Sequence, residues 1–208
     1  MTRYFFTLCL AVIFLAVLGG ETIAEQASPH LPDTSRAYPY LVVAQEDFSA
    51  GYGRIRKELC IASDAESFTA RAQTAIRAAV DLQQKTGADY VQVAITPIAD
   101  IGCHDYFTAI AEYSPDGGGV TGETKHQYWQ VKATDIVLDI EERLVLKAWQ
   151  EAKPDFETGG EVDIERMKQY LAGQLNLSPD EVEEYWLKSV EMGITLRQYR
   201  VKEETQRP

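Results

Sequence analysis

Hydrophobic and polar positions follow two different spacings along the chain. In the first part, apolar residues alternate with polar ones in short runs, a pattern that predicts strands. The runs expected to form strands are 37–48, 54–62, 90–96, 104–113 and 126–133. The segment 63–87 differs, because Phe68 and Ala72 begin a series of apolar residues at helical spacing and Gly87 supplies a C-terminal stop. This part of the chain therefore has the order β-β-α-β-β-β.

The rest of the chain has helical spacing almost throughout. Three helices are expected, over 134–153, 161–176 and 178–193. The third has Ser178 as its N-cap and Pro179 at its first position, and both residues favour a helix start there.

Together the two spacings predict an α+β fold. Residues 38–133 are expected to form a mostly antiparallel or mixed five-stranded sheet with one covering helix. Residues 134–193 are expected to form a three-helix C-terminal part, and the charged segment 194–208 a frayed tail.

The first 24 residues are expected to be a secretory signal peptide. Arg3 and the amino terminus form a short positive region, and an uncharged, mostly apolar stretch follows as far as Gly20. Small residues favour cleavage after Gly20 or after Ala24, and the polar segment 25–37 predicts a disordered lead-in. A cleaved signal predicts a periplasmic or secreted protein without stable membrane insertion, whereas an uncleaved segment would anchor it.

The formal net charge of −12 restricts the choice of partners. Nucleic acid binding needs clustered Lys and Arg, and the sequence has no such cluster. The last two predicted helices are spaced like a helix-turn-helix, but the second of them opens with Asp180 and Glu181, so we exclude DNA. An acidic surface suits solubility, or attraction to a cationic partner.

Cys103, His104 and Asp105 stand side by side just before a predicted strand. Neighbouring side chains on a strand point to opposite faces, so Cys103 and His104 are not expected to form a nucleophile–base pair. A cysteine enzyme would need its base from elsewhere in the chain, which leaves His126 and His30.

A disulfide between Cys60 and Cys103 is the favoured interpretation of the two cysteines left after signal removal. Closing a loop of about 44 residues contributes at most about 4 kcal/mol in the chain-entropy model. Two alternatives stay open. One is a pair of free buried thiols, and the other is a zinc site that adds His104 and His126, whose spacing is unlike that of structural zinc sites.

We predict no catalytic residue, no metal ligand and no cofactor. The glycine-rich stretch "PDGGGVTGETK" has Glu123 where a phosphate loop needs its lysine. Carboxylates early in a helix usually stabilise its dipole or face solvent, although they are also the groups that a hydrolase would use. The acidic pairs in question are Asp135 with Asp139, Glu141 with Glu142, and Glu183 with Glu184.

Tyr128 and Trp129 are candidate partner contacts. They are adjacent on a predicted strand and therefore point to opposite faces, so that one of them is expected to be exposed. An exposed aromatic side chain is a frequent centre of a protein interface.

Four stretches resemble a bacterial family of small proteins known only as a domain of unknown function. They are "YPYLVVAQEDFS", "ADYVQVAIT", "ERLVLKAW" and "LAGQLNLSPDEV", which together touch both parts of the chain. These are patterns of core residues and helix caps, so the resemblance implies no activity and no site residues.

The expected function is that of an exported, non-enzymatic protein that acts by contact with another protein, which is itself unknown. An inhibitor or immunity-type factor that neutralises a cationic envelope enzyme is one version. The alternative is an envelope hydrolase that uses acidic residues or Cys103, and a third interpretation is a structural accessory of an envelope assembly.

Overall fold

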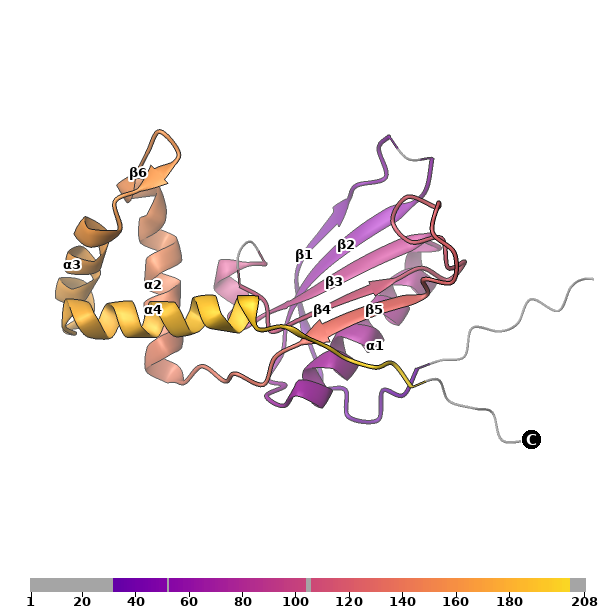
Figure 1. Ribbon diagram of the computed structural model, residues 1–208, viewed down its shortest axis with the longest axis horizontal. Coiled ribbons are helices and arrows are strands. Elements are labelled where there is room, and N and C mark those ends of the chain that lie inside the picture. The colour runs from indigo at the N-terminus through magenta and orange to yellow at the C-terminus, as the bar shows by residue number, and fades with distance from the viewer. Residues whose placement is uncertain (1–31, 52, 104–105, 203–208) are drawn as a thin grey trace, which may run out of the picture.

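The computed structural model describes residues 32–51, 53–103 and 106–202. Six strands form one sheet in the order β1-β2-β3-β4-β5-β8. Their bounds are Leu41–Asp47, Arg56–Ala62, Tyr90–Thr96, Ala109–Tyr113, Trp129–Ala133 and Arg197–Gln198. All neighbours are antiparallel except β2 and β3, which are parallel because helix α1 (Phe68–Thr86) crosses between them. Figure 1 shows α1 behind the strands, so that it covers one face of the sheet.

Three helices form the second part of the molecule, which lies beyond one end of the sheet (Figure 1). They are α2 (Ile140–Phe156), α3 (Ile164–Leu175) and α4 (Pro179–Ile194). A hairpin made of two short strands, β6 (Glu157–Thr158) and β7 (Glu161–Val162), joins α2 to α3. A 3-10 turn, η1 (Ala99–Ile101), follows β3. The predicted α+β class, with one covering helix and a helical C-terminal part, is confirmed.

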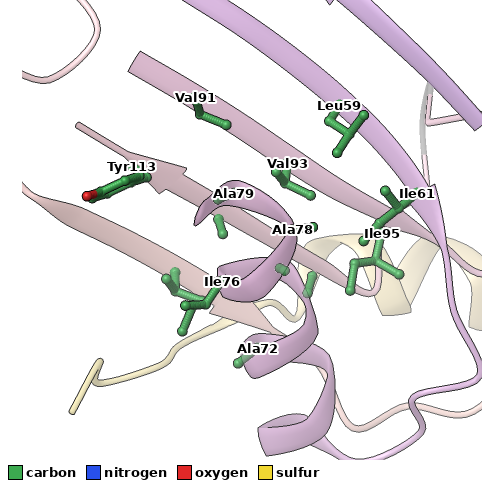
Figure 2. Close-up of a cluster of buried hydrophobic side chains, with 14 of the residues drawn as sticks. Leu59, Ile61, Ala72, Ile76, Ala78, Ala79, Val91, Val93, Ile95 and Tyr113 are labelled. Atoms are coloured by element: carbon green, nitrogen blue, oxygen red, sulfur yellow. The ribbon is translucent and has the colours of Figure 1, made fainter. Parts of the chain in front are cut away.

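The main core lies between α1 and the sheet (Figure 2). Alternate residues of the central strands, such as Val93 and Val131, point to this side and are fully buried. The helix meets them largely with alanines, including Ala72 and Ala79, around the larger Ile76. Small side chains on the contact face allow the helix to lie close to the strands.

The buried guanidinium of Arg71, on α1, connects the two parts of the chain. Its side chain is 3% exposed. It donates hydrogen bonds to the carbonyl oxygens of Ala65, Thr134 and Ile136, at 2.9, 2.8 and 2.8 Å. Thr134 and Ile136 belong to the segment between β5 and α2, so Arg71 fixes the point at which the helical part leaves the sheet.

The predicted frayed tail is wrong for residues 195–202, which run along the sheet. Strand β8 pairs with β5, and Tyr199 is buried beside Phe68. Its hydroxyl accepts a hydrogen bond from Gln73 on α1, at 3.2 Å. The sheet therefore has six strands instead of five, and residues 203–208 lie outside the described part.

The predicted disordered lead-in is also wrong where the structure describes it, from residue 32 onward. The N–H of Arg36 donates to the side chain of Gln73, at 2.6 Å. The N–H of Asp33 donates to the carbonyl of Lys202, at 3.1 Å, which places the two described chain ends side by side. The predicted signal peptide and the rest of the lead-in lie outside the described residues.

The helical part has its own core around two stacked tryptophans. The rings of Trp149 and Trp186 lie 4.5 Å apart between centroids and are nearly parallel. A second cluster, which includes Tyr106 and Leu146, joins these helices to the segment that follows β3. Trp186 donates its indole N–H to the hydroxyl of Tyr106, at 3.2 Å. These contacts position the helices against the sheet.

We expect Arg71→Met to lower the free energy of unfolding by about 3 kcal/mol, because it leaves buried carbonyl groups without donors. Urea unfolding followed by circular dichroism measures the change. Arg77→Met on the same helix is the matched control, since Arg77 is exposed, and it should change stability by less than about 0.5 kcal/mol. Equal losses in both variants would contradict the role of Arg71.

Candidate functional site

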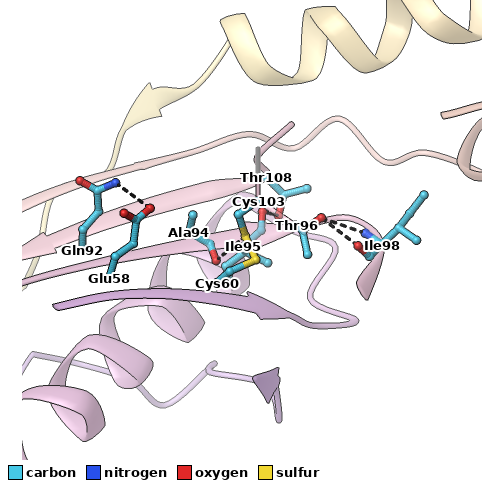
Figure 3. Close-up of a disulfide and its surroundings, with 9 residues drawn as sticks. All are labelled: Glu58, Cys60, Gln92, Ala94, Ile95, Thr96, Ile98, Cys103 and Thr108. Carbon is cyan, nitrogen blue, oxygen red and sulfur yellow. Dashed lines mark hydrogen bonds between the residues drawn. A yellow bond between two sulfur atoms is a disulfide. The ribbon is translucent and has the colours of Figure 1, made fainter. Parts of the chain in front are cut away.

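A disulfide joins Cys60, on β2, to Cys103, just after η1 (Figure 3). The Cα atoms lie 5.6 Å apart, and 43 residues of sequence separate the two cysteines. Figure 3 shows the bond on the side of the sheet away from α1, together with Glu58 and Gln92. We call this side the open face. The disulfide ties the segment after β3 down onto the open face.

The structure separates the groups that a cysteine enzyme would need. The sulfur of Cys103 is bonded to Cys60 and is not a free nucleophile. His126 precedes β5 at the end of the sheet where Tyr113 pairs with Val91, whereas Cys103 lies on the open face beside Cys60 and Ala94, toward the other end of β3. His104, Asp105 and His30 lie outside the described residues.

Five polar side chains form a line across the open face. Successive strands pair Glu46 with Glu58, Glu58 with Gln92, Gln92 with Glu112, and Glu112 with Gln130. We call these five residues the polar row. The residues next to them along the strands, such as Leu59 and Val93, point into the core, so the row points away from α1.

The polar row contains three carboxylates, and two cations, Arg56 and Lys132, lie on the same face, each two residues along a strand from one of its members. None of the three forms an ion pair with a Lys or Arg of the described chain. Partial burial raises the pKa of Glu58, and the neighbouring charge of Glu46 raises it further. Burial also raises the pKa of Tyr90, with a further contribution from Glu112. The row therefore favours a proton or a positive group.

A small hollow lies between the polar row and the disulfide. It measures about 280 Å³ and is lined by Ala44, Glu46, Glu58, Cys60, Gly102 and Cys103. Two carboxylates side by side in such a hollow have two chemical uses: they hold a basic group, or they share a proton as an acid–base pair.

A larger, mostly apolar groove lies where the sheet meets α2. Its volume is about 560 Å³. Its apolar walls include Leu41, Ala62, Pro97, Ile98, Ile140 and Leu144, and its charged lining residues are Asp64, Arg143 and Lys147. We call it the apolar groove. Three of its apolar side chains are widely exposed, with Leu41 at 62%, Ile140 at 76% and Leu144 at 55%. Exposed apolar side chains gathered in one hollow are typical of a binding surface.

The two aromatic candidates occupy the opposite edge of the sheet. Trp129 stacks on Tyr113, with ring centroids 4.1 Å apart, and packs against the main core. Tyr128 is exposed and lies near His126. Both line a hollow of about 420 Å³ with Arg200 and other residues of the C-terminal segment. Tyr128 is the more accessible of the two, and its contact with a partner stays a prediction.

The acidic helix pairs have mainly structural roles. Asp139 and Glu142 form the capping box of α2, and Glu142 also forms an ion pair with Lys188 on α4, with 2.5 Å between the two charged atoms. Glu141 accepts a hydrogen bond from the hydroxyl of Tyr185. Asp135 pairs with Arg197, and Glu183 with Lys168. Within the described ranges, no three His, Cys, Asp or Glu side chains are arranged to hold a metal ion.

Comparison with known proteins identifies the family. The family model described as "Domain of unknown function (DUF4875)" matches residues 35–187, which is most of the chain. The chain belongs to this family. The matched residues run from the segment before β1 into α4, so the DUF4875 match includes both the polar row and the apolar groove.

One solved structure has the same fold as this DUF4875 chain. It is the crystal structure of a DUF487 family protein from Desulfovibrio piger, with 21% sequence identity and a TM-score of 0.60. The likeness covers 81% of this chain and 97% of the other. No curated protein matches the chain.

None of the helices over the described residues is both long and apolar enough to span a bilayer. The predicted signal segment, which would be the anchor if it stays uncleaved, lies outside those residues.

Sequence reasoning missed the polar row and the apolar groove. The alternation of Glu58 with Leu59 already indicated an outward carboxylate, but the strand register was needed to place it beside Glu46. The groove depends on how α2 docks beside β1, for which the sequence has no local signal.

We expect Glu58→Gln to stabilise the protein near neutral pH. The pKa of Glu58 is raised in the folded state, so the folded protein binds this proton more tightly than the unfolded chain does. The resulting stabilisation of the fold is complete below the ordinary pKa of 4.5 and is lost as pH rises through the folded pKa. Replacing the carboxylate removes that loss. Urea unfolding should therefore show Glu58→Gln more stable than wild type at about pH 7 and equal to it at about pH 4 or below.

Exposed Glu184 on α4 is the control for this measurement. Glu184→Gln should shift stability by less than about 0.5 kcal/mol at either pH. If Glu58→Gln is instead less stable than wild type at neutral pH, the carboxylate of Glu58 has a favourable partner in the folded protein, and the expectation of an uncompensated charge is wrong.

Proposed function

We propose that this DUF4875 protein is exported and acts without catalysis, by contact between its open face and a cationic protein. The observation that carries the proposal is the polar row, a line of outward carboxylates that form no ion pair with a lysine or arginine of the described chain. Carboxylates on a sheet face that are not held in ion pairs provide attraction and specificity for an oppositely charged partner.

Export is supported by two features. The first 24 residues have the charge and hydropathy pattern of a signal peptide. The disulfide between Cys60 and Cys103 is of a kind that persists in oxidising compartments and is rare in the cytosol. Both features favour the periplasm or the outside of the cell.

An inhibitor or immunity-type factor is the version that fits the charge. The net charge of −12 attracts basic proteins at a distance, and this attraction weakens as salt is added. A positive surface attracts the anionic polymers of a cell wall, so an envelope hydrolase with such a surface would be a suitable partner. The open face would occupy such a surface and block it.

A second candidate function is hydrolysis by Glu46 and Glu58. It is favoured by the raised pKa of Glu58 in the hollow beside Glu46, because an acid–base pair requires two carboxyls in different protonation states. The Cys103 version has no support in the structure, since its sulfur is bonded to Cys60. Turnover of a cell-wall substrate by wild type but not by Glu58→Gln would favour hydrolysis over binding.

The export proposal predicts the mass and thiol state of the native protein. Protein recovered from a bacterial cell envelope should have lost the residues up to Gly20 or up to Ala24. Alkylation should label Cys60 and Cys103 only after reduction, because both sulfurs are bonded. Intact-mass spectrometry reads both properties in one sample. A chain that still starts at Met1, or a thiol labelled before reduction, would contradict the proposal.

The contact proposal predicts salt-dependent binding to basic cell-wall hydrolases. A basic lysozyme and a panel of basic bacterial hydrolases serve as probes, with affinity and inhibition measured at low and high salt. We expect E46Q/E58Q/E112Q to weaken binding at least about tenfold, because it removes the carboxylates of the polar row.

The control for this binding test carries the same change in charge elsewhere. E123Q/E184Q/E191Q replaces three exposed carboxylates, so that both triple variants take the net charge from −12 to −9. It should bind within about twofold of wild type if the open face makes the contact. Absence of binding to every probe, or equal effects of the two variants, would rule out this version.

A further inference from the structure

Strand β1 is a free edge of the sheet. It pairs with β2 on one side, and none of the strands in the described part pairs with its other side. All of its residues except Val43 are exposed. The opposite edge is covered instead by β8 and the C-terminal segment. A free edge presents unpaired N–H and C=O groups to which another extended chain can be added.

The hydrogen-bond pattern identifies the groups that face outward. Phe48 donates its N–H to the carbonyl of Arg56 on the β2 side, at 3.2 Å. Groups along an antiparallel strand alternate in direction, so Glu46 and Ala44 also face β2. Gln45 and Asp47 therefore direct their main-chain groups away from the sheet. The β-bulge between Val42 and Ala44 shifts the register before Ala44, so this alternation holds for residues 44–48.

The apolar groove continues this edge at the start of β1. Leu41 is the first residue of the strand and also a wall of the groove, which extends to Ile140 and Leu144 on α2. At the other end of β1, Glu46 lies beside Glu58 in the hollow of the open face. One extended segment placed along β1 would meet an apolar site first and an acidic site a few residues later.

The charges select the occupant of this edge. A second copy of the chain would bring the same acidic strand and another net charge of −12, which opposes self-association. A segment that carries Lys or Arg complements Glu46 and Glu58, and an apolar side chain on the same segment fills the groove.

We propose that β1 binds an extended segment of the partner as an additional strand. The main chain of that segment pairs with the outward groups of Gln45 and Asp47. Its apolar side chain enters the groove between Leu41 and Leu144, and its basic side chain reaches Glu46 and Glu58. This inference rests on the proposed function, since it names the kind of segment through which a cationic protein is held.

A random peptide library displayed on phage, selected on the oxidised full-length protein, tests the inference. Enriched peptides should combine an apolar residue with Lys or Arg a few positions away. Gln45→Pro removes one outward N–H while sparing the pairing with β2, and Leu144→Glu places a charge in the groove at an exposed helix position. Each change should weaken an enriched synthetic peptide at least about tenfold.

Two matched controls separate the edge and the groove from general effects. Gln45→Ala keeps the main-chain N–H and should bind within about twofold of wild type. Leu187→Glu alters an equally exposed leucine on α4, at 50%, away from the groove, and should do the same. In wild type, bound peptide should slow hydrogen exchange at the amides of Gln45 and Asp47. The hydrogen-exchange measurement uses only the wild-type protein, so it does not depend on whether a variant folds.

The outcomes distinguish this inference from the proposed function. Failure to enrich any peptide, or enriched peptides that are insensitive to both Gln45→Pro and Leu144→Glu, would overturn strand addition. Hydrolase binding that depends on the polar row but not on these variants would overturn it too, and would leave the proposed function standing. Peptide binding at β1 without any hydrolase binding would support strand addition and remove the inhibitor version.

Discussion

The fold depends on one buried cation. Arg71 places its guanidinium among the carbonyl groups of Ala65, Thr134 and Ile136, which belong to the turn before α1 and to the segment that leads into α2. Burial lowers the pKa of this side chain, and the nearby charge of Arg143 adds to the effect, so the site is costly to form. Three carbonyl acceptors offset that cost and fix where the helical part begins.

The disulfide provides a second attachment between the helical part and the sheet, in addition to the one made by Arg71. Arg71 holds the segment that enters α2, while the bond between Cys60 and Cys103 holds the segment after β3 on the open face. Ile98 and Ile101 of that second segment pack against the cluster that includes Met192 of α4. The helices are therefore attached to the sheet at two places. The apolar groove exists because this double attachment keeps α2 beside β1 without closing the space between them.

The sequence predicted what local spacing determines and missed what distant pairing determines. The α+β class and the covering helix followed from apolar periodicity, which acts within a few residues. Tyr199 stands in a charged segment with no periodicity, and its burial depends on Phe68 and Gln73, more than a hundred residues earlier. The same holds for the site. Each outward carboxylate was visible in its strand, whereas their alignment required the register of β1 with β2.

A free, partly apolar edge strand is normally an aggregation hazard, and β1 carries two of the usual protections. Its bulge shifts the register near Leu41, and the carboxylate of Glu46 repels another acidic chain. Asp47 is already neutralised by an ion pair with Lys57, whereas Glu46 faces the equally acidic Glu58. If Glu46 served only to prevent aggregation at the β1 edge, a carboxylate held in an ion pair, like that of Asp47, would serve as well. An uncompensated pair repels like charge and at the same time attracts a basic segment, so the same residues that keep β1 from pairing with itself select what it pairs with.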